Sequence, residues 1–588
     1  MRNLSFRVPR GGTLAIVGES GSGKSVTSLA AMGLLKFTGG RVTSGRITLN
    51  GPDGSTEITS ASENVLRRIR GNRVSMIFQE PMSSLDPVFT VGNQITEALK
   101  LHRGMTSRTA KDEAARLLDL VRMPNARQQL DRYPHQLSGG MRQRVMIAMA
   151  VSCRPDLLIA DEQTTALDVT IQAQILQIIR DMQAEFGTSA IFISHDMGVV
   201  SQMADEIVVM QGGRMMETGR ARDVILTPSD DYTRALMAAV PRIGAMTGRD
   251  APRPFPLLGE EDIAADHAVP EQAEPLVKLE GVTTRYDVTS GLLGRVTHRV
   301  HAAEDISFQI ALGETLALVG ESGSGKSTVG RTLQHLVAPV SGWILYRGTD
   351  ILSLDPEKRA RFKREIQYVF QDPVGSLNPR RTVRQSLIEP MRVHNLLTDP
   401  DRQVAELLQA VNLPSEHADR YPHEFSDGQR QRICIARALA VDPGLIIADE
   451  TVSALDVSVQ AQVINLMMRL QAERGLAYLF ISLDMAVVER VSHRVAVMYL
   501  GEIVEIGTRR QIFENPQHPY TKRLLKAVPV MDPDTRPERV DLSGDIPGPV
   551  RPVGNPRRPH GFVEIASGHM MADDHQLFEQ EQQGEIQA

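Results

Sequence analysis

The octapeptide GESGSGKS occurs twice in this chain, at residues 18–25 and again at residues 320–327. Each copy fits the phosphate-binding pattern GxxxxGK followed by Ser or Thr, and each follows a short apolar run typical of a buried strand. The glycines let backbone N–H groups turn inward around phosphate oxygens, with the positive end of a helix behind them. Because two identical copies in matching contexts do not arise by chance, the sequence predicts two nucleotide sites.

Composition limits the class of protein before any other motif is considered. A chain of 588 residues exceeds one hydrophobic core and predicts two to four domains. The net charge of -6 argues against a general nucleic-acid binder. The sequence has no run of 18 apolar residues, and its first residues lack the apolar core of a secretory signal. The two cysteines, Cys153 and Cys434, favour reduced, buried thiols over a disulfide or a metal site.

Colinear repeats show that the chain consists of two homologous halves. The apolar run that ends in Asp-Glu at Glu162 returns at Glu450, and a Tyr-Thr pair recurs at Tyr232 and Tyr520. Within each half, short β-branched strands alternate with longer helical stretches. This alternation predicts an α/β fold with a mainly parallel sheet, whose ligand loops lie at the carboxyl ends of the strands.

Four segments follow from these repeats and from local composition. We assign residues 1–241 to the first domain and residues 275–530 to the second. Residues 242–274 are rich in Pro, Gly and Ala and become acidic toward their end, which indicates a solvated linker. Residues 531–588 are again rich in Pro and Arg without clear periodicity, which indicates a loosely packed C-terminal extension.

Polar side chains suited to nucleotide chemistry follow the strands of both halves. The lysine of each octapeptide adds a point charge for phosphates, and the serine after it offers a hydroxyl to Mg²⁺. The first carboxylate of each Asp-Glu pair suits the Mg²⁺ shell, and the second can polarise the attacking water. A glutamine at a strand end is placed to sense the γ-phosphate or Mg²⁺. These residues are Lys24, Ser25, Gln79, Asp161 and Glu162 in the first half, and Lys326, Ser327, Gln371, Asp449 and Glu450 in the second.

Two further elements complete the set in the first half. Leu-Ser-Gly-Gly at residues 137–140 is typical of a helix start, with Ser138 as the cap and glycine N–H groups available to anions. His195 ends another strand, where it is suited to contact the γ-phosphate and the nucleophile.

In this order the elements resemble the ATP-binding-cassette (ABC) ATPases, over nearly all of both halves. The octapeptide, FQEPMSSLDP from Phe78 and NPQHPYT from Asn515 are similar to the peptide/opine/nickel importer branch. The fused two-cassette form is similar to the glutathione-importing members of that branch. The resemblance implies an α/β fold of two tandem cassettes, each with a mainly parallel sheet, a helical subdomain and a small antiparallel β subdomain. It implies ATP and Mg²⁺ as cofactors.

The resemblance also implies roles for particular residues. The implied catalytic residues are Glu162, His195 and Glu450. The implied nucleotide-binding residues are Gly18, Ser20, Gly21, Gly23, Lys24, Ser25, Gln79, Ser138, Gly139, Gly140 and Asp161 in the first half, and Tyr286, Gly320, Ser322, Gly323, Gly325, Lys326, Ser327, Thr328, Gln371, Ser426, Gly428 and Asp449 in the second. The implied Mg²⁺ ligands are Ser25, Gln79, Asp161, Ser327, Gln371 and Asp449.

The same resemblance implies a mechanism and partners. Two cassettes close head to tail, so that each ATP lies between the phosphate loop of one half and the signature of the other. Closure is transmitted to two membrane permease subunits, which receive substrate from a periplasmic binding protein, and fusion of the halves raises their effective concentration. The chain is then expected peripherally on the cytoplasmic face of the cell inner membrane, with no nucleic-acid partner. Glutathione is the expected cargo, with di- or oligopeptides next.

Two residues of the second half depart from this pattern. Its signature reads Phe-Ser-Asp-Gly-Gln, with Asp427 in the place of Gly139. Two like charges about 4 Å apart repel by roughly 4 kcal/mol at an effective dielectric near 20, so Asp427 opposes a γ-phosphate unless its carboxylate points away. Leu483 stands where the first half has His195, and leucine cannot donate a hydrogen bond. We interpret His493, one short helix away, as a surface residue without this role.

A third departure concerns the beginning of the first half. Tyr286 is an aromatic candidate for stacking on adenine, which contributes about 1–3 kcal/mol, and its counterpart would lie before Met1. The opening strands of a complete cassette are missing as well. We interpret this as a misassigned start in preference to a true truncation. Gln163 and Thr451, which follow the catalytic acids, replace the usual proline, and we expect a modest effect there.

The departures divide between the two expected sites and leave three functions open. One site combines Glu162 and His195 with the signature that contains Asp427, and the other combines Glu450 and Leu483 with the intact signature. Slow turnover follows, with ATP binding better retained at the second site. The chain is therefore an energy-coupling importer ATPase or a catalytically weakened relic of one. A soluble double cassette acting on ribosomes or DNA is the third reading, which the acidic linker and the two cysteines disfavour.

Overall fold

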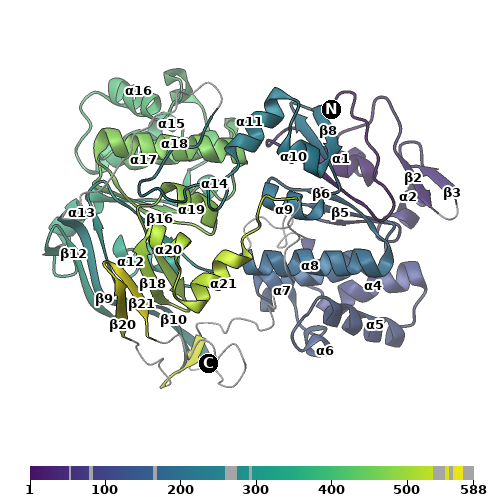
Figure 1. Ribbon diagram of the computed structural model, residues 1–588, viewed down its shortest axis with the longest axis horizontal. Coiled ribbons are helices and arrows are strands. Elements are labelled where there is room, and N and C mark those ends of the chain that lie inside the picture. The colour runs from purple at the N-terminus through teal and green to yellow at the C-terminus, as the bar shows by residue number, and fades with distance from the viewer. Residues whose placement is uncertain are drawn as a thin grey trace. The chain divides into compact units, whose positions relative to one another are not determined.

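The computed structural model describes residues 1–51, 54–78, 84–162, 169–257, 274–290, 295–533, 550–554 and 561–573. The chain divides into two compact units (Figure 1). Unit 1 comprises Met1–Met237 and Pro529–Val540, and unit 2 comprises Ala238–Val528 and Asp541–Ala588. Within the described ranges, the model contains no helix with the length and apolar character that crossing a membrane requires.

Unit 1 is built on a six-stranded sheet in the order β4-β5-β6-β1-β7-β8, in which only β8 is antiparallel. Its inner strands are uninterrupted apolar runs because helices cover both faces of a parallel sheet. Three of the parallel strands therefore end at one edge with the octapeptide, the Asp-Glu pair and the His195 turn. The strands are β1 (Thr13–Gly18), β4 (Val74–Ile77), β5 (Leu157–Asp161), β6 (Ser189–Ile193), β7 (Glu206–Gln211) and β8 (Arg214–Arg220).

The helices of the first cassette include a cluster in which α4, α5 and α7 pack on one another (Figure 1). This cluster is the expected helical subdomain. The helices are α1 (Lys24–Ala31), α2 (Glu63–Ile69), α4 (Val91–Arg103), α5 (Ser107–Leu120), α6 (Ala126–Gln129), α7 (Gly139–Val151), α8 (Val169–Phe186), α9 (Met197–Met203), α10 (Ala221–Leu226) and α11 (Asp231–Ala239).

Unit 2 repeats this sheet and extends it to eight strands, in the order β14-β15-β16-β11-β17-β18-β21-β20. Strands β14 to β17 are parallel with β11, and the remaining three are antiparallel additions. The strands are β11 (Thr315–Val319), β14 (Ile366–Val369), β15 (Leu445–Asp449), β16 (Ala477–Ile481), β17 (Arg494–Tyr499), β18 (Glu502–Thr508), β20 (Phe562–Ala566) and β21 (His569–Ala572).

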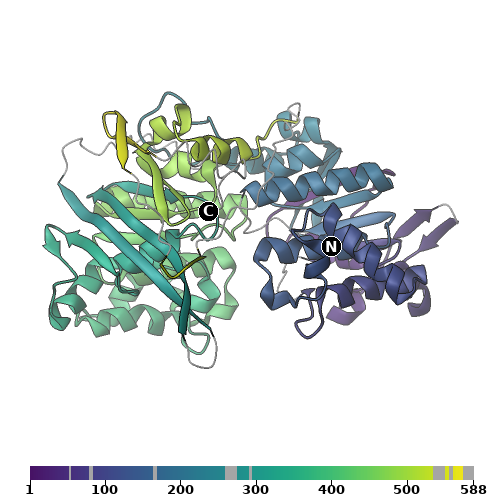
Figure 2. The same ribbon diagram turned by 90° about the horizontal axis from the view of Figure 1, so that it is seen from below.

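A second sheet of unit 2 is the small antiparallel subdomain, in the order β13-β12-β9-β10-β19. The long pair β9 and β10 is drawn in teal in Figure 2. Apolar residues of this sheet and of the parallel sheet share one core with α12 and α13. The strands are β9 (Pro275–Ser290), β10 (Arg295–Ala311), β12 (Ser341–Tyr346), β13 (Thr349–Asp350) and β19 (Val550–Pro552).

The helices of unit 2 follow the same plan, with α15, α16 and α17 packed as its helical subdomain. They are α12 (Lys326–Leu333), α13 (Pro356–Glu365), α14 (Pro373–Ser376), α15 (Val383–Val393), α16 (Pro400–Ala410), α17 (Asp427–Leu439), α18 (Val457–Arg474), α19 (Met485–Val491), α20 (Arg509–Glu514) and α21 (Pro519–Ala527).

The antiparallel part differs between the units. In the described part of unit 1 it is a single hairpin, β2 (Thr48–Gly51) with β3 (Gly54–Glu57). Residues 3–8 match the end of β10 in sequence, yet they form no strand, and Leu4, Phe6 and Val8 instead pack half-buried against the core. A strand needs a hydrogen-bonded neighbour, and the described residues of unit 1 contain no counterpart of β9 to provide one.

The segment interpreted as a solvated linker differs from that interpretation in its described part. Residues 242–257 pack on unit 2, where Met246 and Phe255 are 1% and 4% exposed. The amide of Gly244 donates to Glu489 at 2.8 Å. Two buried apolar side chains, Met246 and Phe255, are sufficient to dock this segment. They hardly change its mean composition, which is why the composition indicated a solvated linker. The acidic residues 258–273 lie outside the described residues.

The described part of the C-terminal extension is likewise more ordered than its composition indicates. Strand β21 pairs with β18, and β19 pairs with β10. His569 of β21 is 1% exposed, and its Nε2 lies 2.8 Å from Oε1 of Glu505, which is 0% exposed. Strand pairing to an existing sheet edge needs backbone groups rather than apolar periodicity, so the sequence pattern gave no sign of it.

Candidate nucleotide sites

Both octapeptides form the turn between the central strand and its helix, as the sequence predicts. Gly18 and Gly320 have φ of 143° and 147°. A Cβ at Gly320 would lie 2.2 Å from the carbonyl oxygen of Met498, so no other residue fits there. Gly23 and Gly325 cap α1 and α12 in the left-handed region. The loop therefore enters each helix with its amide groups facing the space where an anion binds.

The lysine of each loop is buried and turned back on its own loop. Lys24 Nζ donates to the carbonyl oxygens of Gly18 at 2.7 Å and Glu19 at 3.1 Å. Lys326 Nζ makes the same two bonds, both of 2.8 Å, to Gly320 and Glu321. Because burying a charge is costly without partners, these bonds hold the ammonium groups in place at the loops.

The serine and the first carboxylate converge in both units. Ser327 Oγ donates to Asp449 Oδ1 at 2.8 Å, and Ser25 Oγ lies 3.4 Å from Asp161 Oδ1. Burial and the neighbouring Glu162 raise the pKa of Asp161 to about 6. A hydroxyl beside a buried carboxylate is an oxygen donor set of the kind that Mg²⁺ takes, so the residues fit that ion.

In unit 1 the second carboxylate lies between the loop lysine and the histidine. Glu162 is 4.0 Å from Lys24 Nζ and 4.0 Å from Nδ1 of His195. His195 holds the pKa of Glu162 below its ordinary value, against the effect of burial. Glu162 has φ of 46°, a left-handed conformation that is uncommon outside glycine, and its amide donates to Ile193 on the neighbouring strand. The structure thus brings together the predicted lysine, carboxylates and histidine of the first half.

In unit 2 the matching carboxylate has a different partner. Glu450 has φ of 48°, and its Oε2 accepts a hydrogen bond from Gln371 Nε2 at 2.6 Å. Leu483 occupies the turn after β16, where unit 1 has His195. Asp449 also accepts from the hydroxyl of Tyr368 at 2.5 Å. The sequence gave no signal for Tyr368, because Met76 stands at its place in the first half.

The signature residues begin α7 and α17, as predicted. Ser138 accepts from the amide of Met141, and Ser426 accepts from the amide of Gln429. A Cβ at Gly428 would lie 2.2 Å from Val459, so this glycine is required by close packing on α18. Around Gly139 the space is open.

The openness at Gly139 explains how Asp427 is accommodated at the equivalent position. Asp427 Oδ1 accepts from Arg430 Nη1 at 2.6 Å. The expected repulsion of a γ-phosphate therefore comes from a partly neutralised carboxylate that is held toward its own helix, not from a bare charge.

His493 is not the surface residue that the sequence indicated. It is half-buried, and its Nδ1 accepts from the amide of Thr315 at 3.0 Å, at the amino end of β11. In unit 1 Asp205 accepts from Thr13 in the same way, at 2.8 Å. The residue is therefore structural and lies at the end of the strand opposite the phosphate loop.

The remaining predicted residues lie as follows. Tyr286 is on β9 and is 38% exposed, so its ring is accessible to an adenine base. Cys153 and Cys434 are both free and buried. Thr451 is 3% exposed. Gln79, Gln163 and residues 166–168 lie outside the described residues. The other predicted loop residues, Ser20, Gly21, Ser322, Gly323 and Thr328, fall within the two loops or the first turn of α12.

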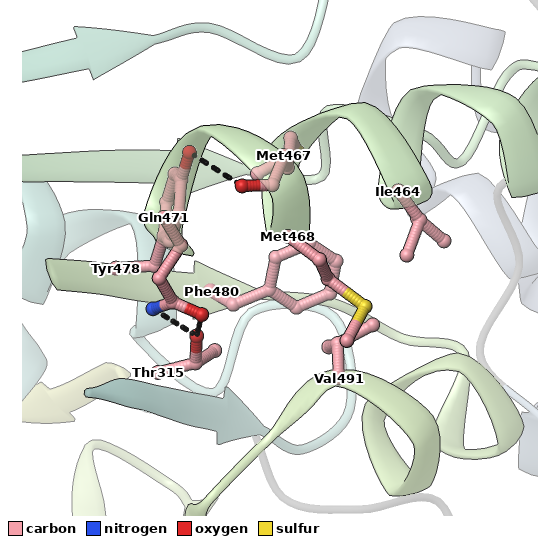
Figure 3. A pocket seen from close by; sticks show the side chains of 8 residues that line it. All are labelled: Thr315, Ile464, Met467, Met468, Gln471, Tyr478, Phe480 and Val491. Atoms are coloured by element: carbon pink, nitrogen blue, oxygen red, sulfur yellow. Dashed lines mark hydrogen bonds between the residues drawn. The ribbon is translucent and has the colours of Figure 1, made fainter. Parts of the chain in front are cut away.

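A pocket in unit 2 lies away from these groups. It is lined by residues of α18, β16 and α19 together with Thr315 (Figure 3). Inside it Gln471 bonds to Thr315, and the hydroxyl of Tyr478 donates to the carbonyl oxygen of Met467 at 3.2 Å. Thr315 begins β11 whereas the phosphate loop follows the end of that strand, so this pocket is not the nucleotide site.

Fold and site together define a P-loop nucleotide-binding ATPase with two cassettes. The ABC transporter family profile matches residues 1–165 and 303–453. The profile of the oligopeptide/dipeptide transporter C-terminal region matches residues 216–255 and 504–555. The chain belongs to the ABC transporter family, and it is an ATP-binding ATPase subunit of the importer type.

Similar proteins agree with this membership. The chain is 56% identical over 583 residues to the glutathione import ATP-binding protein GsiA of Escherichia coli (strain K12), covering 97% of this chain and 93% of the relative. It is 56% identical over 581 residues to the protein of the same name from Shigella dysenteriae serotype 1 (strain Sd197), with the same coverage. Among solved structures, the complex of archaeal ribosomal stalk protein aP1 with ribosome recycling factor aABCE1 matches 99% of this chain and 95% of the matched chain. Its TM-score is 0.56 at 19% identity, a likeness of fold alone.

Proposed function

We propose that this chain is the energy-coupling ATPase of an importer for glutathione, with small peptides as the next candidate cargo. The observation that supports it most is the 56% identity over 97% of the chain to glutathione import proteins. The proposed partners are two membrane permeases and a periplasmic binding protein, with the chain on the cytoplasmic face of the inner membrane.

We assign the same roles in both units. Lys24 and Lys326 bind the nucleotide phosphates, since each is a buried ammonium at an anion-ready loop. Ser25 with Asp161, and Ser327 with Asp449, hold Mg²⁺, which neutralises phosphate charge when bound. Gln79 and Gln371 contact this ion or the γ-phosphate.

The general base and its surroundings differ between the units. Glu162 orients the attacking water beside His195, whereas Glu450 performs that role with Gln371 and without a histidine. Asp427 adds a negative charge to the second signature. We therefore propose reduced turnover relative to a fully matched double cassette, under the head-to-tail pairing that the family resemblance implies.

The experiment is reconstitution of the chain with its permeases in vesicles, with the binding protein added. Stimulation of ATP hydrolysis by glutathione, and not by di- or tripeptides of other composition, is the expected result. Stimulation by peptides alone would replace the cargo, and binding of ATP without measurable hydrolysis would identify a relic. Two permease reading frames and a secreted binding protein beside the gene would support the same assignment.

A further inference from the structure

A tyrosine outside the assigned nucleotide residues contacts the phosphate loop of unit 2. The hydroxyl of Tyr520 accepts a hydrogen bond from the amide of Glu321 at 3.0 Å. Glu321 is the second residue of the octapeptide, and Tyr520 is on α21, almost two hundred residues further along the chain. Tyr520 is 1% exposed, and its ring packs on Tyr499 at 4.6 Å between centroids.

The same contact is made independently in unit 1. There the hydroxyl of Tyr232, on α11, accepts from the amide of Glu19 at 3.3 Å. The residue two positions before the tyrosine differs between the units, Asp230 in unit 1 and His518 in unit 2. Each nevertheless caps the tyrosine amide, at 2.9 and 3.1 Å respectively. The hydroxyl reaches the loop whichever residue forms the cap.

The loop residue held by each tyrosine is also the one that holds the lysine. The N–H of Glu321 donates to Tyr520, while its carbonyl oxygen accepts from Lys326 Nζ at 2.8 Å. In unit 1 the carbonyl oxygen of Glu19 accepts from Lys24 Nζ at 3.1 Å. Because a residue's own N–H and C=O are joined by only two torsions, fixing one restricts where the other can point. The tyrosine therefore acts on the lysine through one residue.

The segment before each tyrosine is itself held to an antiparallel strand of the sheet, β18 in unit 2 and β8 in unit 1, by a glutamate. Glu505 on β18 accepts from the amides of Gln517 at 2.8 Å and His518 at 3.0 Å, just before α21. Glu217 on β8 accepts from the amides of Ser229 at 2.9 Å and Asp230 at 3.2 Å, just before α11. A chain of hydrogen-bonded residues thus connects β18 and β8 to the phosphate loops of their units.

We propose that Tyr520 and Tyr232 are positioning residues of the two phosphate loops: each hydroxyl fixes the second loop residue, and through it the phosphate-binding lysine. Tyr232 and Tyr520 lie in the two segments, residues 216–255 and 504–555, that match the oligopeptide/dipeptide transporter C-terminal region, so this part of the chain contributes to the nucleotide site. The inference rests on the assignment of Lys326 and Lys24 to the phosphates made above.

The test compares Tyr520→Phe with a matched buried tyrosine. Tyr478→Phe also removes a buried hydroxyl of unit 2 that makes a backbone hydrogen bond, but at the opposite end of β11 (Figure 3). Full-length chains carrying Lys24→Ala, which silences the first loop, are titrated with a fluorescent ATP analogue. Loss of one hydrogen bond to a buried amide predicts about tenfold weaker binding for Tyr520→Phe. Tyr478→Phe should bind as its parent does.

Turnover kinetics separate positioning from a structural effect. In the intact chain, Tyr520→Phe should raise KM for ATP more than it lowers kcat, while its thermal midpoint falls no further than that of Tyr478→Phe. The mirror experiment uses Tyr232→Phe with Lys326→Ala, which keeps the question answerable if the Tyr520 variant does not fold. Unchanged ATP affinity in both tyrosine variants would overturn the inference.

A separate outcome identifies a failure of the proposed function. If Lys24→Ala and Lys326→Ala leave ATP binding intact, the loops themselves are misassigned. If the lysine variants lose binding and the tyrosine variants do not, only the positioning role is wrong.

Discussion

Asp427 and Arg430 form an ion pair of 2.6 Å in the first turn of α17. The two residues are separated by about one helical turn, the i,i+3 spacing at which side chains meet on a helix. Arg430 Nε also donates to the carbonyl oxygen of Pro422 at 2.8 Å, so its guanidinium is fixed from two sides. The equivalent Arg142 of the first half makes the same bond to Pro134, with Gly139 in place of the aspartate. The arginine that compensates the charge of Asp427 is therefore present at the equivalent position of the first half as well, where the signature has a glycine.

The first prediction concerns this compensation. Arg430→Ala should lower ATPase turnover further, because it leaves the carboxylate uncompensated near the expected γ-phosphate. A loss of about fivefold corresponds to roughly 1 kcal/mol, the upper range for a partly exposed pair. Steady-state ATPase assays of Arg430→Ala with and without Asp427→Gly measure the coupling between the two residues.

The first half provides the control for this cycle. Arg142→Ala loses the same bond to a proline carbonyl in a helix that begins with Gly139 instead of an aspartate, so it reports the cost of losing that bond where Asp427 has no counterpart. Equal losses in Arg142→Ala and Arg430→Ala would show that Arg430 does not act through Asp427.

The second prediction restores the family pattern in both departing positions. Asp427→Gly together with Leu483→His should raise ATPase activity at least about tenfold, or about 1.4 kcal/mol of barrier. The glycine removes a charge, and the histidine places a donor beside Glu450 as His195 lies beside Glu162. Leu483→Gln is the matched control, a polar side chain that cannot become a cation. An unchanged rate in the double variant would refute the proposal that these positions limit turnover.

The site was largely predictable where its residues end buried strands. Apolar runs predict parallel strands, and parallel strands bring their carboxyl ends to one edge. Lys24, Asp161, Glu162 and His195 therefore converge as expected. The Asp427–Arg430 pair was also predictable, because i,i+3 spacing alone brings opposite charges together on a helix.

Contacts between elements far apart in sequence were not predictable in this way. Tyr368 reaches Asp449 from a neighbouring strand, and Tyr520 reaches Glu321 from a helix beyond the sheet. The Tyr-Thr repeat marked Tyr232 and Tyr520 as shared by the halves, but it carried no information on their partner. Docking of Phe255 has no periodic signal at all, because one side chain is enough to anchor an irregular segment.

The third prediction is a pH dependence of stability in unit 2. Glu314 is 4% exposed and accepts from the amide of Ala311 at 2.7 Å, with Arg494 at 3.3 Å. Burial raises the pKa of Glu314 above its ordinary value, and Arg494 offsets part of this effect. The folded state then binds a proton more tightly than the unfolded state, so the stabilisation is complete below the unfolded pKa. It is lost as the pH rises through the raised value.

Glu314→Gln removes this titration and keeps an amide oxygen for Ala311. The stability of the wild type relative to Glu314→Gln should therefore fall as the pH rises above the ordinary pKa of a glutamate, about 4.3. Urea unfolding followed by fluorescence of Trp343, the single tryptophan and a residue of β12, reports unit 2 alone. Glu357→Gln, at an exposed position on α13, is the control. A difference that grows with pH would contradict the assigned direction.

The fourth prediction concerns the segment that docks before the second cassette. Asn465 of α18 accepts from the amide of Phe255 at 2.7 Å and donates to its carbonyl oxygen at 2.9 Å. The guanidinium of Arg490 lies 4.9 Å from the centre of the Phe255 ring. Phe255→Ala removes both the buried ring and the cation–π contact, so residues 242–257 should undock. The cost to unit 2 should stay below the ~3–5 kcal/mol of a core Phe→Ala change, because an undocked segment leaves no closed cavity.

Hydrogen exchange measures this undocking directly. The Phe255 amide is protected by Asn465, so in Asn465→Ala it should exchange at least about tenfold faster, and in Phe255→Ala the neighbouring amides should do the same. Trypsin should also cut faster after Arg249, an exposed arginine within the segment that undocks. Pro256→Ala changes an exposed neighbour and should leave exchange and cleavage as in the wild type. If Asn465→Ala and Phe255→Ala both exchange at the wild-type rate, residues 253–255 are held by contacts other than the ring and the asparagine.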